Sequence, residues 1–227
     1  YTVTVTDNGC SSTDNTPIVV NPLPNATATS NSPVCAGDAI NLSTPAVGGA
    51  TYSWTGPGGF TSSIREPVIN NANAGDAGTY TVTVTDNGCS STNNTTVVVN
   101  ATPNVTASNN GPVCSGTTLN LSATNVAGGS YSWSGPNGFT SSAQNPSIPN
   151  VTAAAGGTYT VTVTANGCTS ASANTTVSVT PAPTAVMSGS NTICSGNQTL
   201  VSIAFTGTAP WNFTFTTNGG SPISFST

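Results

Sequence analysis

A motif of twelve residues recurs at a fixed interval and constrains the fold more than any other feature of the chain. It reads Tyr-Thr-Val-Thr-Val-Thr-Asp-Asn-Gly-Cys-Ser-Ser from Tyr1 and from Tyr80, and it returns from Tyr159 with small changes, one copy every 79 residues. Alternating β-branched residues turn one side chain towards a core and the next towards water, which predicts a half-buried strand. Asn-Gly supplies the positive φ values of a tight hairpin turn. The chain is therefore predicted to be an array of domains that each contain this hairpin.

The same interval gives the expected domain boundaries within the 227 residues. We expect the closing hairpin of a domain at 1–21, complete repeats at 22–100 and 101–180, and the opening of a divergent repeat at 181–227. Short proline linkers separate these parts, because proline donates no ladder hydrogen bond. The first and last parts are incomplete repeats, so we expect the chain to be a segment of a longer array.

Charge is almost absent from this sequence. Charged residues make up 3% of the chain, which has one basic residue, Arg65, and no histidine. Soluble proteins contain about a quarter charged residues, so Thr, Ser and Asn must solvate this surface, and attached glycans are expected to help keep it from associating. Nucleic-acid binding needs a basic surface and is excluded. No apolar run of about 18 residues is present, so no membrane span is predicted.

Short β-rich runs bounded by turn residues predict six strands in the first complete repeat. They are Ala26–Ser30, Ala39–Ser43, Thr51–Trp54, Pro67–Ile69, Thr79–Thr85 and Thr92–Val99. The second complete repeat has the same spacing, and no helical periodicity appears. Units of this size, all strand and turn, predict a β-sandwich.

Two aromatic positions indicate which kind of sandwich this is. Trp54 lies 19 residues after Cys35, where an immunoglobulin-type sandwich carries its core tryptophan on the third strand. The segment Asp76–Tyr80 matches the tyrosine corner of such sandwiches, in which the hydroxyl bonds back upstream. We therefore predict an all-β chain of tandem immunoglobulin-like sandwiches in a linear array. The predicted core residues are Trp54, Trp133, Tyr80, Tyr159, Leu42, Val82, Leu121 and Val161.

Several motifs carry a family resemblance across nearly the whole chain. They are Pro33-Val-Cys-Ala-Gly37 and Pro112-Val-Cys-Ser-Gly116, Tyr52-Ser-Trp54 and Tyr131-Ser-Trp133, and the Asn-Gly-Cys hairpins. The chain resembles the immunoglobulin-like and PKD-like repeats of giant surface proteins in the Bacteroidota, many of them exported by the type IX secretion system. The motif Thr208–Phe213 resembles a sister repeat type of the same proteins. The resemblance implies an extracellular location at the cell surface.

The six cysteines are expected to form disulfides, since an extracellular setting is oxidising and no Cys-x-x-Cys motif is present. One pairing joins Cys35 to Cys89, and Cys114 to Cys168, within each repeat. The direction of the strands argues against it, because Leu42 and Val82 hold the usual core disulfide positions. Cys35 is expected in the turn between the first two strands, before Leu42, and Cys89 after Val82, so the two cysteines would lie about 40 Å apart.

A disulfide requires Cα atoms about 4.4 to 6.8 Å apart, which favours a staggered pairing of Cys35 with Cys168 between consecutive repeats. Cys10 and Cys89 would then pair with preceding repeats, and Cys114 and Cys194 with following ones. The alternative pairing within each repeat remains open from the sequence.

Candidate catalytic and metal sites have little support. Without histidine or lysine, the chain cannot form Ser-His-Asp, Cys-His or Ser-Lys arrangements. The acids change between repeats, since Asp38 becomes Thr117 and Asp76 becomes Ala155, and none follows a calcium-loop spacing. We therefore predict no enzyme activity, no cofactor and no metal.

Two classes of function remain. The chain is predicted to be the shaft of a secreted adhesin or extracellular filament, whose partners are neighbouring repeats or copies of itself, with strand donation between copies as a further version. The alternative is a carbohydrate-binding or other ligand-binding module of a secreted protein, in which Trp54, Trp133 and Trp211, with Phe60 and Phe139, would stack on sugars. Core packing is the preferred interpretation of these aromatic residues.

Overall fold

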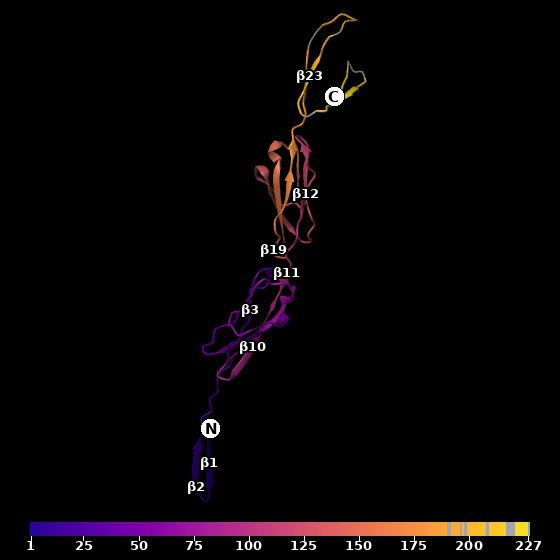
Figure 1. Cartoon of the computed structure of the whole chain (residues 1–227). Coiled ribbons are helices and arrows are strands. Elements are labelled where there is room, and N and C mark those ends of the chain that lie inside the picture. Colours follow the sequence, from indigo (N-terminus) through magenta and orange to yellow (C-terminus); the bar gives the residue numbers. More distant parts are fainter. Residues whose placement is uncertain (190–191, 196, 198, 208, 217–220, 227) are drawn as a thin grey trace. The chain divides into compact units, whose positions relative to one another are not determined.

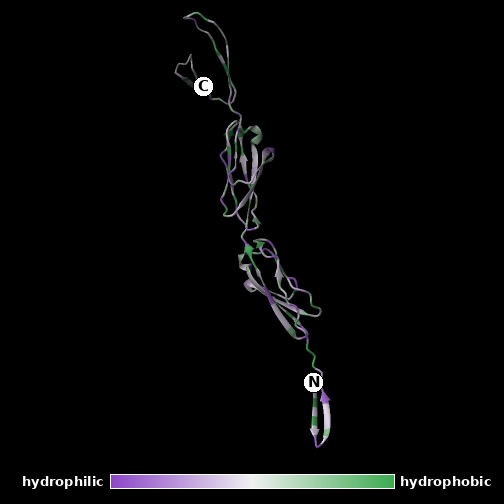
Figure 2. Cartoon of the chain, turned by 180° about the vertical axis from the view of Figure 1, so that it is seen from behind, coloured by the Kyte–Doolittle hydropathy of each residue, from purple (hydrophilic) through white to green (hydrophobic). Residues whose placement is uncertain are grey.

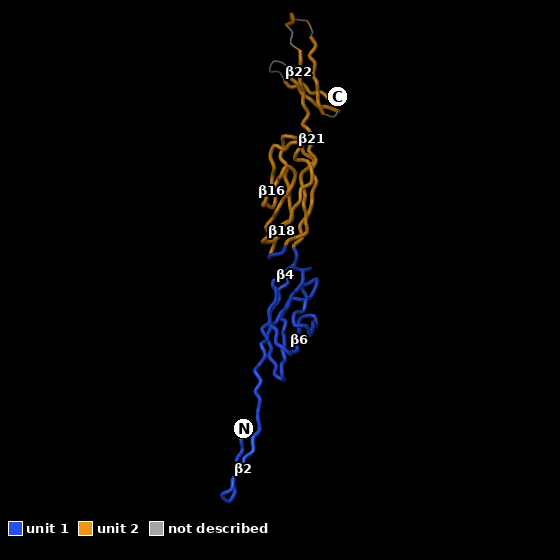
Figure 3. The backbone as a smooth tube through the Cα atoms, turned by 90° about the vertical axis from the view of Figure 1, so that its left-hand side faces the viewer, with its two compact units in different colours: residues 1–102, 166–168 blue, residues 103–165, 169–227 orange. Residues whose placement is uncertain are grey.

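The structure is a computed structural model that describes residues 1–189, 192–195, 197, 199–207, 209–216 and 221–226 (Figure 1). It divides into two units, one of residues 1–102 and 166–168 and one of residues 103–165 and 169–227, drawn in blue and orange in Figure 3. Each unit is described by itself. Thr208, the first residue of the motif Thr208–Phe213, and Thr227 lie outside the described residues.

The first unit begins with a two-stranded hairpin. Its strands β1 (Thr2–Asp7) and β2 (Cys10–Asn15) pair antiparallel, and Asp7 lies opposite Cys10. Asn8 and Gly9 connect them with φ angles of 47° and 82°, the positive values that the Asn-Gly sequence predicts. Figure 2 shows hydrophobic residues recurring along β1 beside the mainly polar β2.

The first complete repeat follows in the same unit and forms two sheets. Its elements are β3 (Thr29–Ser30), β4 (Val34–Cys35), β5 (Ile40–Ser43), β6 (Thr51–Thr55), η1 (Pro57–Gly59), β7 (Thr61–Ser62), β8 (Val68–Ile69), η2 (Ala74–Asp76), β9 (Gly78–Asp86), β10 (Cys89–Val97) and β11 (Val99–Asn100). One sheet has the order β3-β5-β8, and the other has the order β10-β9-β6-β7. Strand β4 pairs in parallel with β11. This strand order is that of an immunoglobulin-like β-sandwich.

The core of this repeat lies between the two sheets. Ile40 and Leu42 point into it from β5, and Trp54, Tyr80 and Val82 point into it from β6 and β9, all at most 1% exposed. These residues alternate with exposed ones along β5, and with exposed or partly buried ones along β6 and β9, as the period of two requires. Burial of these large side chains is the main stabilisation of the repeat, at about 1.5–3 kcal/mol for each large aliphatic or Phe-sized side chain fully buried.

The second complete repeat belongs to the second unit, apart from residues 166–168. Its elements are β12 (Ala107–Asn109), β13 (Val113–Cys114), β14 (Leu119–Ala123), β15 (Ser130–Gly135), η3 (Pro136–Gly138), β16 (Phe139–Ser141), β17 (Ser147–Ile148), η4 (Ala153–Ala155), β18 (Gly157–Ala165), β19 (Cys168–Thr169), β20 (Ala173–Val177) and β21 (Val179–Thr180). The sheets are β12-β14-β17 and β16-β15-β18-β19, with β20 also on β18, and β13 pairs in parallel with β21. The buried residues Leu119, Leu121, Trp133, Tyr159 and Val161 repeat the core of the first sandwich.

The structure corrects the expected ends of several strands. Cys35 was predicted in a turn, which is wrong, because it lies in β4, where its neighbour Val34 donates its N–H to the carbonyl of Val98 at 3.0 Å. The predicted strand at 92–99 is two strands, since the N–H of Val98 donates to the hydroxyl of Ser32 rather than to a strand. The predicted strand from Ala26 begins three residues later.

The last segment forms two further hairpins. Strands β22 (Ala185–Ser188) and β23 (Ser202–Phe205) make one, and β24 (Asn212–Phe215) and β25 (Ile223–Ser226) make the other. Phe205, Phe213 and Phe225 form a row of ring contacts with centroid distances of 4.8 and 5.8 Å. This aromatic row has no counterpart in the two complete repeats, in agreement with a divergent sequence.

Candidate functional site

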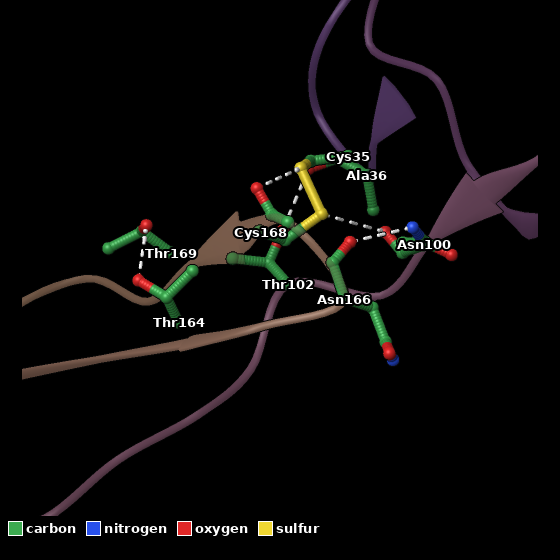
Figure 4. Close-up of a disulfide and its surroundings, with 9 residues drawn as sticks. Cys35, Ala36, Asn100, Thr102, Thr164, Asn166, Cys168 and Thr169 are labelled. Atoms are coloured by element: carbon green, nitrogen blue, oxygen red, sulfur yellow. Dashed lines mark hydrogen bonds between the residues drawn. A yellow bond between two sulfur atoms is a disulfide. The ribbon is translucent and has the colours of Figure 1, made fainter. Parts of the chain in front are cut away.

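A disulfide joins Cys35 of the first complete repeat to Cys168 of the second (Figure 4). Their Cα atoms are 5.6 Å apart, and the two residues are separated by 133 positions in the chain. Both residues belong to the first unit, which includes residues 166–168. The structure thus brings together the two cysteines of the staggered pairing and not those of the pairing within each repeat.

Local sequence places both sulfur atoms. Cys168 is the first residue after the turn made by Asn166 and Gly167, whose φ angles are 50° and 81°. Cys35 is held in β4 by parallel pairing with β11, where the N–H of Ala36 donates to the carbonyl of Asn100 at 2.8 Å. The hairpin turn and the linker strand are therefore the two elements that define the site.

Backbone carbonyls, a side-chain amide and a hydroxyl group surround the disulfide. The side-chain amide of Asn100 donates to the carbonyl of Asn166 at 2.9 Å, and the hydroxyl of Thr102 donates to the carbonyl of Ala36 at 3.0 Å (Figure 4). The Sγ atom of Cys168 lies 4.0 Å from the carbonyl oxygen of Asn100, and Cys168 is 1% exposed. Burial and neighbouring hydrogen bonds thus accompany the covalent bond where the turn meets the linker.

A second copy of this arrangement lies 79 residues earlier in the first unit. The side-chain amide of Asn21 donates to the carbonyl of Asn87 at 3.1 Å, and the Sγ atom of Cys89 lies 3.7 Å from the carbonyl oxygen of Asn21. Asn87 and Gly88 form the same turn, with φ angles of 46° and 77°. Cys89 is a free cysteine, so this copy has the turn and the linker asparagine but no bonded cysteine.

The remaining cysteines are also free. Cys10 and Cys114 are exposed in strands, and Cys194 is exposed in the last segment. Cys114 occupies in β13 the position that Cys35 has in β4, and the hydroxyl of Thr180 contacts its sulfur at 3.7 Å. The structure therefore leaves four of the six cysteines without a bonded partner among the described residues.

The aromatic residues considered as sugar platforms occupy other positions. Trp54 and Trp133 are 0% and 1% exposed in the two cores, and they present no face to a ligand. Phe60 packs edge-on against Tyr80, with ring centroids 5.5 Å apart at 71°, and Phe139 contacts Tyr159 in the same way. Trp211 is partly buried and stacks on Phe205 at 5.5 Å.

The two tyrosine corners are present in the structure. The hydroxyl of Tyr80 donates to the carbonyl of Asp76 at 2.8 Å, and that of Tyr159 donates to the carbonyl of Ala155 at 2.9 Å. Burial raises the pKa of both tyrosines, and the carboxylate of Asp76 raises the pKa of Tyr80 further. These groups fix the entry into β9 and β18 and have no access to a ligand.

No metal site or membrane helix is found in the part of the chain that the structure describes. No three His, Cys, Asp or Glu side chains there gather closely enough to hold a metal ion. No helix within those same residues is long and apolar enough to cross a membrane.

The linker asparagines Asn21 and Asn100 are the functional residues that sequence reasoning missed. Both end the same Val-Val-Asn sequence, 79 positions apart, and this repetition was the available signal. Their role depends on a turn 66 residues further along the chain, which no local pattern predicts.

Comparison with known proteins adds similarity of fold only. No protein-family model and no curated protein matches the chain. Among solved structures it is similar to murine CEACAM1b at 10% identity, with 69% of this chain and all of that chain covered and a TM-score of 0.42. The titin I-band fragment I67-I69 is similar at 10% identity, with 84% of this chain and 85% of that chain covered and a TM-score of 0.42. Drosophila OTK extracellular domains 3-5 are similar at 14% identity, with 70% of this chain and 63% of that chain covered and a TM-score of 0.45.

Proposed function

We propose that this chain is a shaft segment of a secreted bacterial adhesin or extracellular filament, and that a disulfide between consecutive repeats carries its mechanical load. The observation that supports this is the bond between Cys35 and Cys168, which belong to different repeats. Contacts between adjacent domains are usually small and allow motion. A covalent tie from one repeat to the next converts such a junction into a fixed one.

The position of the tie in the chain determines which residues bear force. When the chain is pulled from both ends, tension passes from Cys35 to Cys168 through the disulfide. The intervening residues 36–167 then carry no load, although they include β5 to β11 of the first repeat and β12 to β18 of the second. Most strands of both sandwiches are therefore protected from mechanical unfolding while the bond is intact.

Location and surface chemistry agree with this proposal. Disulfides persist in oxidising compartments, so the bond supports an extracellular site. The motif resemblance supports a protein of the Bacteroidota type, and a surface of Thr, Ser and Asn with 3% charged residues suits glycan decoration. The burial of Trp54 and Trp133 speaks against sugar stacking by these two residues, and the chain is proposed to have no enzyme activity.

Single-molecule pulling of the full chain from its two ends tests the load path. The 133-residue separation corresponds to about 450 Å of extended chain, at roughly 3.4 Å per residue. We expect the oxidised protein to extend by that much less than the reduced protein. The Cys35→Ser variant should extend as far under oxidising conditions as the reduced wild-type protein does.

Cys114→Ser is the matched control, because it removes a cysteine that is free in the structure. It should keep the shortened extension of the oxidised wild type. Equal extension of oxidised and reduced wild-type protein, or a Cys35–Cys89 peptide in a non-reduced digest, would rule out the proposed load path.

A further inference from the structure

Four asparagine–glycine pairs lie in the two complete repeats, beginning at Asn87, Asn110, Asn137 and Asn166. Glycine has no Cβ atom to hinder its backbone nitrogen, so an asparagine before it loses its side-chain amide more readily than other asparagines do. All four asparagines are exposed. Access of water therefore does not distinguish these pairs, whereas their hydrogen bonds do.

The pair at Asn110 is held at both reacting groups. The Oδ1 atom of Asn110 accepts from the N–H of Asn120 at 2.8 Å, and its Nδ2 atom donates to the carbonyl of Thr118 at 3.2 Å. The nitrogen of Gly111, which would have to attack Asn110, donates to the Oδ1 atom of Asn109 at 2.6 Å. These bonds keep the nitrogen and the amide carbon from reacting.

Asn87 and Asn166 occupy the same place in the two hairpin turns and differ in the residue before them. The Nδ2 atom of Asn87 donates to the carboxylate of Asp86 at 3.2 Å. Ala165 precedes Asn166, whose side-chain amide makes no hydrogen bond within the described ranges and points away from the disulfide (Figure 4). The main-chain carbonyl of each turn asparagine accepts from a linker asparagine. The two turns are thus matched except for the carboxylate.

We propose that Asn166 is a site of spontaneous deamidation where the turn meets the linker. The nitrogen of Gly167 attacks the Cγ atom of Asn166, the Cγ–Nδ2 bond breaks, and ammonia leaves with the proton of the attacking nitrogen. Water then opens the five-membered imide ring. One water molecule is taken up, one ammonia is released, and no electrons are transferred. The reaction needs only the turn and water, so it does not depend on the proposed shaft function.

The carboxylate of Asp86 should slow the same reaction at Asn87. Attack on the amide carbon places negative charge on the side-chain oxygen, and a neighbouring carboxylate repels that charge. A unit charge about 4 Å away in water changes the rate by about fivefold. Asn166 should therefore react at least about fivefold faster than Asn87.

The product changes the contact between turn and linker. When the ring opens at its main-chain carbonyl, residue 166 becomes isoaspartate, and the chain runs through one additional carbon atom. A two-residue hairpin turn cannot keep its geometry with that extra atom. The carbonyl that accepts from Asn100 at 2.9 Å becomes a carboxylate outside the main chain. Deamidation therefore adds a negative charge and loosens the turn beside Cys168.

Timed incubation of the full chain in mildly alkaline buffer tests the site. Samples are digested without reduction at mildly acidic pH, and the Asn-Gly peptides are quantified by mass spectrometry with electron-transfer fragmentation, which distinguishes isoaspartate from aspartate. We expect Asn166 to react at least about fivefold faster than Asn87. It should react at least about tenfold faster than Asn110, whose hydrogen bonds must break first.

Two variants match the comparison of the turns. Asp86→Ala gives the first repeat the Ala-Asn-Gly-Cys turn of the second, so the rate at Asn87 should rise to that of Asn166 while the rate at Asn166 stays unchanged. Asn166→Gly keeps the positive φ of the turn at no steric cost and removes the amide. It should abolish the reaction at residue 166.

Hydrogen exchange measures the loosening of the turn. The N–H of Ser170 donates to the carbonyl of Val163 at 2.9 Å, close to the turn. Peptides that contain Ser170 should exchange faster in aged wild-type protein than in fresh protein. Aged Asn166→Gly protein should show no such increase, because it cannot form isoaspartate at residue 166.

The outcomes distinguish this site from the proposed load path. Equal rates at Asn166 and Asn87, or an unchanged rate at Asn87 in Asp86→Ala, would overturn the proposed site. Equal exchange in aged and fresh wild-type protein would overturn the loosening of the turn. In the unreduced digest the Asn166 peptide should be joined to that of Cys35. Absence of that link from fresh oxidised protein would overturn the load path and leave the deamidation rates as they are.

Discussion

In the first complete repeat the guanidinium group of Arg65 donates to the carbonyl of Thr44 at 3.1 Å, and in the second the amide of Gln144 donates to the carbonyl of Ala123 at 2.9 Å. The two donors occupy the same repeat position, and the two carbonyls do as well. One repeat thus uses the sole basic residue of the chain where the other uses a neutral amide. The fold needs a donor at this place and does not need a charge.

The next position of each repeat also exchanges a charged group for a neutral one. The hydroxyl of Ser43 donates to the carboxylate of Glu66 at 3.4 Å, and that of Ser122 donates to the amide oxygen of Asn145 at 2.9 Å. Here an amide replaces an acid and makes the shorter bond. At both positions the sandwich accepts an uncharged partner, which is compatible with a chain with 3% charged residues.

The largest expected effect comes from removing the tryptophan of either core. Trp54→Ala or Trp133→Ala should each destabilise its own repeat by about 3–5 kcal/mol, because a large buried side chain leaves a cavity. The loss of stability should be larger for Trp133→Ala, because the Nε1 of Trp133 also donates to the carbonyl of Gln144 at 3.3 Å. The Nε1 of Trp54 has no hydrogen-bond partner among the described residues. Hydrogen exchange with mass spectrometry of the full chain measures the two repeats separately.

Trp54→Phe and Trp133→Phe serve as the paired controls. Both keep most of the apolar volume, and only the second loses a hydrogen bond. Equal costs for the two replacements would show that the tryptophan hydrogen bond does not distinguish the repeats.

An intermediate effect is expected at Arg65. Arg65→Ala should cost about 1–3 kcal/mol because it leaves the carbonyl of Thr44 without its donor in a largely buried site. Arg65→Gln should stay within about 0.5 kcal/mol of the wild type, since Gln144 makes the same bond in the second repeat. Urea unfolding monitored by hydrogen exchange of the first repeat gives both values.

The ion pair of Arg65 with Glu66 does not alter this expectation. Its side chains are 37% and 52% exposed, and exposed pairs contribute about 0–1 kcal/mol. If Arg65→Gln proved as damaging as Arg65→Ala, the charge itself would be needed and the comparison of the two repeats would be wrong.

The sequence was sufficient for the features that follow from period and turn chemistry. Alternating Val and Thr with Asn-Gly predicted the hairpins, and the strand order of both complete repeats forms the predicted immunoglobulin-like sandwich. The predicted core residues are buried, because alternate side chains of a strand point to the same face, and that face contains Trp54 or Trp133.

Features that depend on contacts between residues far apart in the chain could not be predicted from the sequence. The short strand at Cys35 exists because β11 pairs with it, and its two residues carry no pattern of their own. Gly56 is required because a Cβ atom there would collide with the ring of Tyr80, a contact between residues 24 positions apart. The amide of Asn100 finds its acceptor in the turn of the following repeat. Such contacts are set by tertiary packing, which overrides local preference.

The smallest expected effect distinguishes the two tyrosine corners at high pH. Burial raises the pKa of Tyr80 and Tyr159 above the ordinary value of 10.0, and Asp76 raises that of Tyr80 further, whereas Ala155 in the second repeat has no charge. Because the folded pKa exceeds the unfolded pKa, this contribution to stability is complete below pH 10.0 and is lost as pH rises through the folded value. The first repeat should therefore hold its tyrosine proton to a higher pH than the second.

Carbon-13 labelling of the tyrosine ring carbon that bears the hydroxyl allows each titration to be followed by NMR in the full chain. Asp76→Ala makes the first repeat match the second at this position and should lower the pKa of Tyr80 towards that of Tyr159. The η2 turn would also lose its capping carboxylate, at a cost of about 0.5–2 kcal/mol, so the titration must be read below the unfolding transition. Unchanged ionisation of Tyr80 in this variant would mean that burial alone sets its pKa, and that the two repeats differ in charge at this corner without differing in its electrostatics.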